Sequence, residues 1–285
     1  DYLLDFDDVI KYATKKCQKL KLPYKEIIID EFQDTSKLRL DFIKEIQKNT
    51  NANLTVVGDD FQSIYKFSGC NLNIFINFKD YFPETETFKI QNTYRNSQEL
   101  IRIAGDFVMK NQYQIKKNLK SNIHLNNPIK IIRYFNKYQA LLKAIKKINT
   151  GEILILGRNN FDIHNFIPQD KIIWKENGYF EIIGFNYNLR YLTIHKSKGL
   201  ESDNVIIINL ENSLLGLPSK KKNHNILKLI QNPDEYLFAE ERRLFYVALT
   251  RAKERLIVTG ISKDLEKDLK EKEELLILYS KENKI

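Results

Sequence analysis

Two adjacent carboxylates in the segment IIIDEFQD, residues 27–34, stand where they could take part in phosphoryl transfer. The three isoleucines before them predict a buried strand, and parallel sheets bind their ligands beyond the carboxyl ends of the strands. Asp30 could hold a Mg²⁺ ion bound to a nucleotide, while Glu31 could orient and deprotonate the attacking water. Acidic residues after a strand also cap helices, so this pair alone leaves both interpretations open.

A second group of polar and aromatic residues lies in GDDFQSIYKFSG, residues 58–69, directly after another predicted strand. Gln62 has an amide suited to sensing a terminal phosphate. Tyr65 and Phe67 are two residues apart, so in an extended segment they point to the same face, where paired rings can stack the bases of a single strand. Taken without the neighbouring motifs, the same two rings are explained at least as well by core packing.

Five segments of the chain resemble the second through sixth motifs of the UvrD/Rep-type superfamily 1 DNA helicases. They occur in the order of that family: DEFQD at 30–34, GDDFQSIYKFSG at 58–69, TYRNSQEL at 93–100, TIHKSKGLESDNVII at 193–207 and EERRLFYVALTRAKERL at 240–256. The resemblance covers about residues 5–260, and Phe67-Ser68-Gly69 is more like the DNA helicase IV branch. It implies an ATP-dependent DNA helicase or translocase that moves 3′ to 5′.

The resemblance implies a role for each residue that matches a motif of the family. The residues implied to bind or act on the nucleotide are the Mg²⁺ ligand Asp30, the catalytic base Glu31, the phosphate sensor Gln62, the adenine-stacking Tyr94, the γ-phosphate ligand Arg95, the ribose acceptor Glu201 and the arginine finger Arg251. The residues implied to bind DNA are Tyr65, Phe67, Thr193 and His195. The implied cofactors are ATP and Mg²⁺, and the implied partner is single-stranded DNA or a duplex with a single-stranded tail.

Two adjacent arginines in the last motif are predicted to be mainly structural. Arg242 and Arg243 point about 100° apart on a helix, so both cannot face one nucleotide. We expect them to form an ion-pair set with Glu240 and Glu241.

The first motif of the family, the phosphate-binding loop GxxxxGK[ST], is missing from the sequence. None of the ten glycines is followed by lysine. In the family this loop lies N-terminal to the other motifs, whereas Glu31, Arg95 and Arg251 are all present here. We therefore expect the 285 residues to be a fragment of a longer ATPase and to be inactive alone.

Runs of four to six apolar residues alternate with segments of helical period, which predicts an α/β fold with mostly parallel sheets. The predicted strands are 26–30, 53–58, 86–90, 129–134, 152–157, 204–210 and 254–259. The predicted helices are 36–48, 97–110, 137–148 and 236–250, and Ser36 and Asn96 are candidate N-caps. A hairpin is predicted at Asn177-Gly178, an irregular insertion at 211–235 and a charged helix at 262–285.

The resemblance implies two RecA-like lobes of the P-loop NTPase type. We expect an incomplete first lobe at residues 1–91, without the P-loop, and a second lobe at residues 92–285. Because the P-loop strand is missing, the first lobe should expose an apolar sheet face or edge. The large domain inserted in bigger members would be reduced to the hairpin within residues 159–192 or absent.

The composition restricts the compartment and leaves the partner open. A net charge of +9 suits a nucleic acid, but 36 of the 46 basic residues are lysines, which an AT-rich genome gives to proteins of any function. Cys17 and Cys70 have no metal-binding neighbours and are predicted to be reduced and structural. No apolar run of about 18 residues and no signal peptide are present, so we expect a cytoplasmic protein without a membrane partner.

Two other functions fit the same motifs. One is the motor of a helicase–nuclease of the RecB or AddA type, although no cluster of nuclease-type carboxylates and lysine follows the last motif. The other is a non-catalytic module that binds single strands through Tyr65 and Phe67. A phosphate-binding loop upstream of Asp1 would favour the ATPase, and its absence would favour the binding module.

Overall fold

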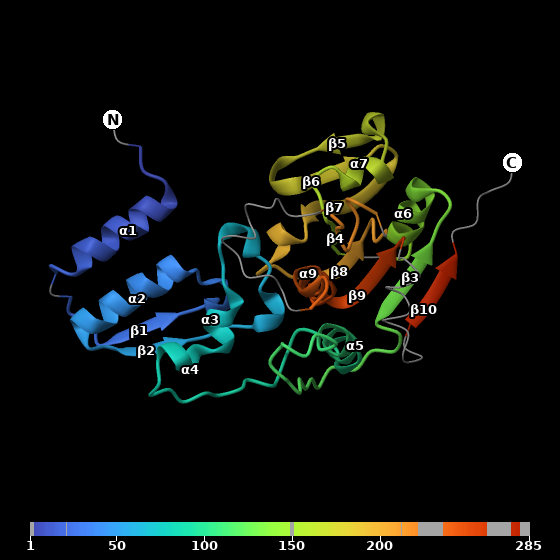
Figure 1. Ribbon diagram of the computed structural model, residues 1–285. Coiled ribbons are helices and arrows are strands. Elements are labelled where there is room, and N and C mark those ends of the chain that lie inside the picture. The colour runs from blue at the N-terminus through green and yellow to red at the C-terminus, as the bar shows by residue number, and fades with distance from the viewer. Residues whose placement is uncertain are drawn as a thin grey trace, which may run out of the picture. The chain divides into compact units, whose positions relative to one another are not determined.

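The computed structural model describes residues 3–20, 22–148, 151–211, 213–221, 236–260 and 275–279. The chain divides into two compact units, residues 1–88 and 89–285 (Figure 1). The division after Phe88 lies close to residue 91, where the sequence predicts the boundary, and each unit is an α/β structure of its own.

Unit 1 is built around a single strand–helix–strand repeat. Its elements are α1 (Phe6–Cys17), β1 (Glu26–Ile29), α2 (Lys37–Thr50), β2 (Asn53–Val56), α3 (Leu72–Ile76) and α4 (Phe78–Tyr81). β1 and β2 pair in parallel, with Glu26 opposite Asn53 and Ile29 opposite Val56, and α2 is the crossover between them. The Ser36 hydroxyl accepts a hydrogen bond from the Arg39 amide at 3.3 Å, which confirms the predicted N-cap of α2.

One face of the small sheet in unit 1 is covered and the other is open. Phe32, Leu40, Ile43 and Ile74 are buried against the inner face, where Ile29 also packs. Ile28 points the other way and is 74% exposed. The predicted buried strand is therefore wrong for β1, because no element covers its outer face among the described residues, whereas the expected exposed apolar face is present.

Unit 2 contains an eight-stranded, mostly parallel sheet, which confirms the predicted fold class. The strand order is β10-β3-β9-β8-β4-β7-β6-β5, parallel from β10 to β7 and antiparallel from β7 through β6 to β5. The strands are β3 (Ile129–Arg133), β4 (Ile153–Gly157), β5 (Ile172–Trp174), β6 (Tyr179–Ile182), β7 (Phe185–Thr193), β8 (Ser202–Ile207), β9 (Ala252–Thr259) and β10 (Leu275–Tyr279).

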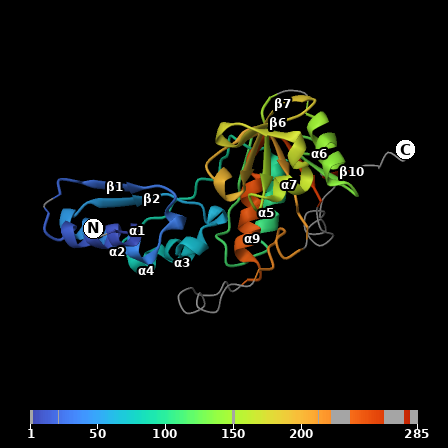
Figure 2. The ribbon, with the colours of Figure 1, turned by 90° about the horizontal axis from the view of Figure 1, so that it is seen from above.

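Helices cover both faces of this sheet. They are α5 (Gln98–Val108), α6 (Lys137–Lys146), α7 (Asp162–Phe166) and α9 (Ala239–Leu249). α5 and α9 lie side by side, with the Phe107 and Phe245 rings in edge-to-face contact at 5.4 Å, while α6 and α7 pack on the other face (Figure 2). Ile132, Ile155 and Ile257 project from β3, β4 and β9 into the core beneath α6 and α7. Since every second residue of a strand faces this core, the intervening isoleucines and leucines face α5 and α9.

Three predicted elements are corrected by the structure. Residues 86–90 form no strand and pair with no neighbour, and Phe88 and Ile90 are exposed. A charged helix is predicted at 262–285, but residues 275–279 of that range form the strand β10, which pairs in parallel with β3. The rest of that range lies outside the described residues, as do residues 212 and 222–235 of the predicted insertion. α5 is capped by Ser97, whose hydroxyl accepts from the Leu100 amide at 3.2 Å, instead of by Asn96.

The predicted hairpin and the predicted state of the two cysteines agree with the structure, whereas two elements of the structure were not predicted. Asn177 and Gly178 both have positive φ at the turn between antiparallel β5 and β6, so the predicted hairpin is confirmed. Cys17 and Cys70 are free and buried. α1 and β7 were not predicted from the sequence. Within the part of the chain that the structure describes, no helix combines the length and the apolar character needed to span a membrane.

The start of α5 gives a prediction about pH. Partial burial alone would raise the pKa of Glu99, but hydrogen bonds from the Leu125 amide at 2.9 Å and the His124 ring at 2.8 Å outweigh it and lower the pKa from 4.5 to about 2. The ionised carboxylate therefore stabilises unit 2 above pH 4.5, and this contribution is lost as the pH falls from 4.5 toward 2. We expect Glu99→Gln to be less stable than the wild type at neutral pH and to converge with it in acid.

Urea unfolding at a series of pH values measures this difference. Glu254→Gln, which removes the same charge from an exposed position on β9, is the control and should show no such convergence. A stability difference for Glu99→Gln that is independent of pH would contradict the assignment.

Candidate functional site

The first candidate site lies at the carboxyl end of β1. Glu31 adopts a left-handed backbone conformation with φ of 52°, which is uncommon outside glycine and asparagine. The Asp30 carboxylate accepts a hydrogen bond from the Glu31 amide at 2.7 Å, and the Phe32 amide donates a hydrogen bond to the Val57 carbonyl at 2.9 Å. Both carboxylates are thereby held on exposed residues beyond the strand, in the position expected from the sequence.

A chain of hydrogen bonds joins Glu31 to Gln62. The Gln33 amide nitrogen donates to the Glu31 carboxylate at 2.5 Å, and the Gln33 amide oxygen accepts from the Asp59 backbone at 2.9 Å. The Asp59 carboxylate accepts from the Gln62 side chain at 2.7 Å. Gln33 is fully buried, and a Cβ at Gly58 would lie 2.6 Å from its amide oxygen, so only glycine leaves room for this contact.

The sequence did not single out Gln33 or Asp59. The sequence offered two signals: an amide side chain, Gln33, two residues after Glu31, and a glycine, Gly58, at the start of the second motif. What the sequence could not show is that the left-handed turn at Glu31 brings the two motifs together.

Tyr65 and Phe67 form an aromatic pair in unit 1. The segment is not extended as predicted but turns through a 3-10 helix, Lys66–Ser68. The two rings nevertheless contact each other edge to face, with 6.0 Å between centroids and 74° between planes. Phe67 is 69% exposed, which argues against the alternative that it is a core residue, while Tyr65 is half-buried.

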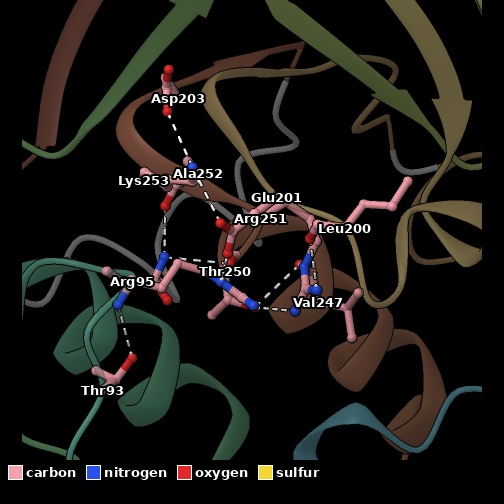
Figure 3. A network of polar contacts seen from close by, with 11 residues as sticks. Thr93, Arg95, Leu200, Glu201, Asp203, Val247, Thr250, Arg251, Ala252 and Lys253 are labelled. Atoms are coloured by element: carbon pink, nitrogen blue, oxygen red, sulfur yellow. Dashed lines mark hydrogen bonds and ion pairs between the residues drawn. The ribbon is translucent and has the colours of Figure 1, made fainter.

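The second candidate site, in unit 2, is an ion-pair network centred on Glu201 (Figure 3). The Arg95 Nε donates to one carboxylate oxygen of Glu201 at 2.6 Å, and the Lys253 ammonium lies 3.1 Å from the other. Lys253 also lies 3.4 Å from the Asp203 carboxylate. The hydrogen bonds from Lys253 and Arg95 lower the pKa of Glu201 below its ordinary value, so this carboxylate stays ionised.

Lys253 is a residue that the sequence analysis missed. β8 and β9 are neighbouring strands, and Ser202 lies opposite Ala252. Glu201 directly precedes Ser202 and Lys253 directly follows Ala252, so this pairing brings the two charged residues close together. The pairing of β8 with β9 is the only signal that could have brought them together, because they are far apart in the sequence.

Arg251, the predicted arginine finger, is 1% exposed. Its guanidinium donates to the carbonyls of Val247 at 2.9 Å and Leu200 at 3.1 Å, and to the Thr250 hydroxyl at 3.2 Å (Figure 3). Arg251 therefore connects the end of α9 to the loop that carries Glu201. Contact with a phosphate would require some of these hydrogen bonds to be exchanged.

Asn96 fixes the segment that carries Tyr94 and Arg95. Its side chain is buried and donates to the carbonyls of Ala252 at 2.6 Å and Thr250 at 3.3 Å. Tyr94 itself is 83% exposed, so its ring is available to stack on a planar ligand. Asn96, predicted as the N-cap of a helix, therefore links the TYRNSQEL segment to the last motif segment.

Thr193 and His195, the other predicted DNA-binding residues, lie at the end of β7. Thr193 is buried, and its hydroxyl accepts from the Lys196 amide at 3.4 Å. His195 begins a 3-10 turn, His195–Ser197, and is partly exposed. The two residues are separated by Ile194, and of the two only His195 has a side chain at the surface.

The predicted ion-pair set on α9 is corrected for Glu241. This carboxylate pairs with Arg158, whose Nη2 lies 2.9 Å away, and accepts from the Ser219 amide at 3.0 Å. Arg243 is buried and donates to the Gln114 side chain at 3.2 Å, while the Arg242 guanidinium lies 5.0 Å from the centre of the Phe107 ring. As predicted, the two arginines diverge.

Comparison with known proteins gives two family matches. Residues 1–83 match the UvrD/REP helicase N-terminal domain, and residues 162–263 match the UvrD-like helicase C-terminal domain. Escherichia coli DNA helicase IV is 31% identical over 259 residues, which are 89% of this chain and 36% of the relative. The ATP-dependent DNA helicase Rep of Buchnera aphidicola from Acyrthosiphon pisum is 30% identical over 253 residues, 80% of this chain and 38% of the relative.

A more distant relative is covered over more of its length. A probable DNA helicase of Mycoplasma pneumoniae is 27% identical over 278 residues, 91% of this chain and 49% of the relative. The chain thus spans between about a third and a half of the curated relatives it matches.

Burial of Arg251 gives a prediction about stability. Arg251→Ala would remove the hydrogen bonds to the carbonyls of Val247 and Leu200 and to the Thr250 hydroxyl, and we expect it to reduce the free energy of unfolding by roughly 2–4 kcal/mol. Arg255→Ala, on the following strand β9 and less buried, is the control and should cost far less. Urea denaturation measures both. Equal, small losses would show that the Arg251 hydrogen bonds do not stabilise unit 2.

Proposed function

Because the chain belongs to the UvrD/Rep family of helicases, we propose that it is part of an ATP-driven DNA helicase motor. The observation that most directly supports this is the hydrogen-bonded path from Glu31 through Gln33 and Asp59 to Gln62. Gln62 is three residues before Tyr65, so one short segment connects a carboxylate suited to hydrolysis with an aromatic pair suited to bases.

In unit 1, Asp30 and Glu31 would act on Mg²⁺-ATP. The fit of Mg²⁺ rests on two exposed carboxylates beyond a parallel strand, because oxygen ligands of this kind are the ones Mg²⁺ prefers. Bound Mg²⁺ would neutralise phosphate charge. Glu31 would orient the attacking water and accept its proton, and Gln33 holds the Glu31 carboxylate in one orientation for that task.

In unit 2, Tyr94, Arg95 and Glu201 would bind the nucleotide. The exposed Tyr94 ring would stack on adenine, and the planar Arg95 guanidinium would contact a phosphate. Arg95 is held ready by Glu201 and would leave it when the phosphate arrives. Glu201, kept ionised by Lys253, would then be free to accept a bond from the ribose.

In unit 1, Tyr65 and Phe67 would stack bases of a single strand, alone or as the tail of a duplex. In unit 2, the His195 side chain would contact DNA, and the buried Thr193 lies at the same end of β7. Movement from 3′ to 5′ is supported by the family alone. We also propose that unit 1 corresponds to a first RecA-like lobe, extending to about residue 91, and unit 2 to a second. A cytoplasmic location is supported by the two free cysteines.

One observation favours a second function. The sequence contains no phosphate-binding loop, while Phe67 offers an exposed ring, as expected for a module that binds single strands without hydrolysing ATP. The hydrolysis test below separates this function from the motor, because both functions predict single-strand binding through Tyr65 and Phe67.

The first test concerns single-stranded DNA. Phe67→Ala and Tyr65→Ala should each weaken binding by about 1–3 kcal/mol per lost stacked base, without sequence preference. Fluorescence titration with mixed-sequence oligonucleotides at one salt concentration measures this. Phe88→Ala, which removes another exposed ring of unit 1 outside the motifs, is the control. Unchanged affinity with a lower Tm would show that Tyr65 and Phe67 serve only packing.

The second test concerns hydrolysis. The 285-residue chain should release phosphate from ATP at a negligible rate, because no loop of the GxxxxGK[ST] type in its sequence holds the phosphates in position for hydrolysis. In the full-length protein, which we propose carries that loop, DNA should stimulate a Mg²⁺-dependent ATPase. There, Arg95→Ala should reduce kcat by a factor of about 10³ or more.

Glu31→Gln in the full-length protein should abolish turnover and leave nucleotide binding measurable. Glu45→Gln, an equivalent change on α2, is the control. Turnover by the 285-residue chain, or full activity of the Glu31→Gln protein, would contradict these roles. To test Arg251 in the same hydrolysis assay, Arg251→Lys is the better variant, because it keeps the positive charge, whereas Arg251→Ala also removes hydrogen bonds that stabilise the fold.

A further inference from the structure

The positive charge of the chain is concentrated in one segment. Residues 107–151 contain ten basic side chains and not one aspartate or glutamate. The rest of the chain has 36 basic and 37 acidic side chains, a net charge of −1. An AT-rich genome would raise the lysine content everywhere, so it does not explain this concentration. None of the five helicase motifs lies within the segment.

In the structure, this segment forms β3 and α6, and α6 presents its lysines outward. The helix buries Ala140, Leu141, Ala144 and Ile145 against the sheet. Lys146 lies three positions after Lys143 and Lys147 lies four positions after it, so the three side chains fall within about 100° of one another around the helix. Lysines in a last turn also stabilise a helix end, but that effect is confined to α6 itself.

A lysine from a different element extends the same surface. The Lys171 ammonium, just before β5, lies 5.1 Å from the centre of the Tyr138 ring of α6. Conversely, the Lys146 ammonium of α6 lies 5.5 Å from the centre of the Phe185 ring of β7. α6 and the β5–β7 region thus form one basic surface, the α6 patch, consisting of Lys143, Lys146, Lys147 and Lys171.

Nearby acidic groups are mostly paired with other lysines. Glu211 lies 2.8 Å from Lys137, and Glu181 pairs with Lys175 on the hairpin. Asp170 is adjacent to Lys171 in the sequence. Glu211 and Glu181 therefore do not neutralise Lys146, Lys147 and Lys171 of the α6 patch.

We propose that the α6 patch binds the phosphate backbone of duplex DNA, without reading its sequence. Lysine ammonium groups bind phosphates as point charges, and no arginine, the usual bidentate reader of bases, belongs to the patch. Tyr138 and Phe185 are half-buried beneath the lysines, so they do not offer the open ring faces that single-stranded bases need. In this respect the patch differs from the exposed Phe67.

An anionic membrane surface is the other polyanion to consider. No large apolar side chain of α6 is exposed, since Tyr138 is half-buried and the other apolar residues of the helix are buried. Ile183, whose amide donates to the Lys171 carbonyl at 3.0 Å, is 58% exposed, but one isoleucine does not make the apolar face that insertion between lipids needs. Duplex DNA is therefore the better match. This inference rests on the proposed function only in taking DNA, rather than RNA, as the duplex.

The test uses the full chain with Lys146→Gln, Lys147→Gln and Lys171→Gln combined, assayed without ATP. Binding of a short blunt duplex of mixed sequence is followed by fluorescence anisotropy over a range of NaCl concentrations. The logarithm of the binding constant falls as log salt rises, and each lost phosphate contact makes this negative slope shallower by about 0.9. The slope of the triple variant should therefore be shallower than that of the wild type by about 2.7. The matched control is Lys15→Gln, Lys19→Gln and Lys48→Gln, an equal loss of charge from exposed positions of unit 1.

The proposal is supported if the patch variant loses slope and duplex affinity, the control variant keeps both, and arginine at the three patch positions restores them. Unchanged duplex binding by the patch variant, or equal losses in both variants, overturns it. So does weaker binding to phosphatidylserine vesicles with duplex binding intact. Single-strand binding through Phe67 is measured in parallel with an oligo-dT, so a failure of the proposed function is seen separately from a failure of the patch.

Discussion

The buried guanidinium of Arg251 determines how the polar network of unit 2 is arranged. A charged group removed from water is strongly unfavourable unless hydrogen bonds replace its hydration. Here the carbonyls of Leu200 and Val247 and the Thr250 hydroxyl do so. Because Leu200 is adjacent to Glu201, the same contacts fix the start of β8 and hence the carboxylate that binds Arg95 and Lys253. Asn96 adds a second buried link to the same turn.

The main elements of the fold could be predicted where burial is continuous. β4 reads ILILG and is buried at every position, so a run of apolar residues was sufficient to find it. β7 was missed because asparagines interrupt its pattern, although Phe185, Tyr187, Leu189 and Tyr191 alternate with a period of two. Residues 86–90 show the reverse case: the apolar residues are present, but a strand also needs a neighbour, and local sequence does not supply one.

For the candidate sites, the sequence identified residue types but not their contacts. Motif positions such as Glu31, Gln62, Arg95 and Glu201 were found, whereas Gln33, Asp59 and Lys253 were not. The missing residues depend on a left-handed turn and on the pairing of β8 with β9, both of which are properties of the folded chain. Arg251 was found as a candidate finger, but its burial could not be predicted, since one of the carbonyls that bind its guanidinium belongs to Leu200, which is far away in the sequence.

The sharing of Glu201 between two cations has a consequence for the cost of exchanging ligands. When Arg95 leaves Glu201 for an incoming anion, the carboxylate is not stranded, because Lys253 remains beside it as a reserve counter-ion. All three side chains are partly open to water, where solvent screening makes an ion pair weak. The arginine is therefore released from a shallow energy well. A guanidinium held in this way keeps its orientation at rest and still responds to a modest gain in binding energy elsewhere.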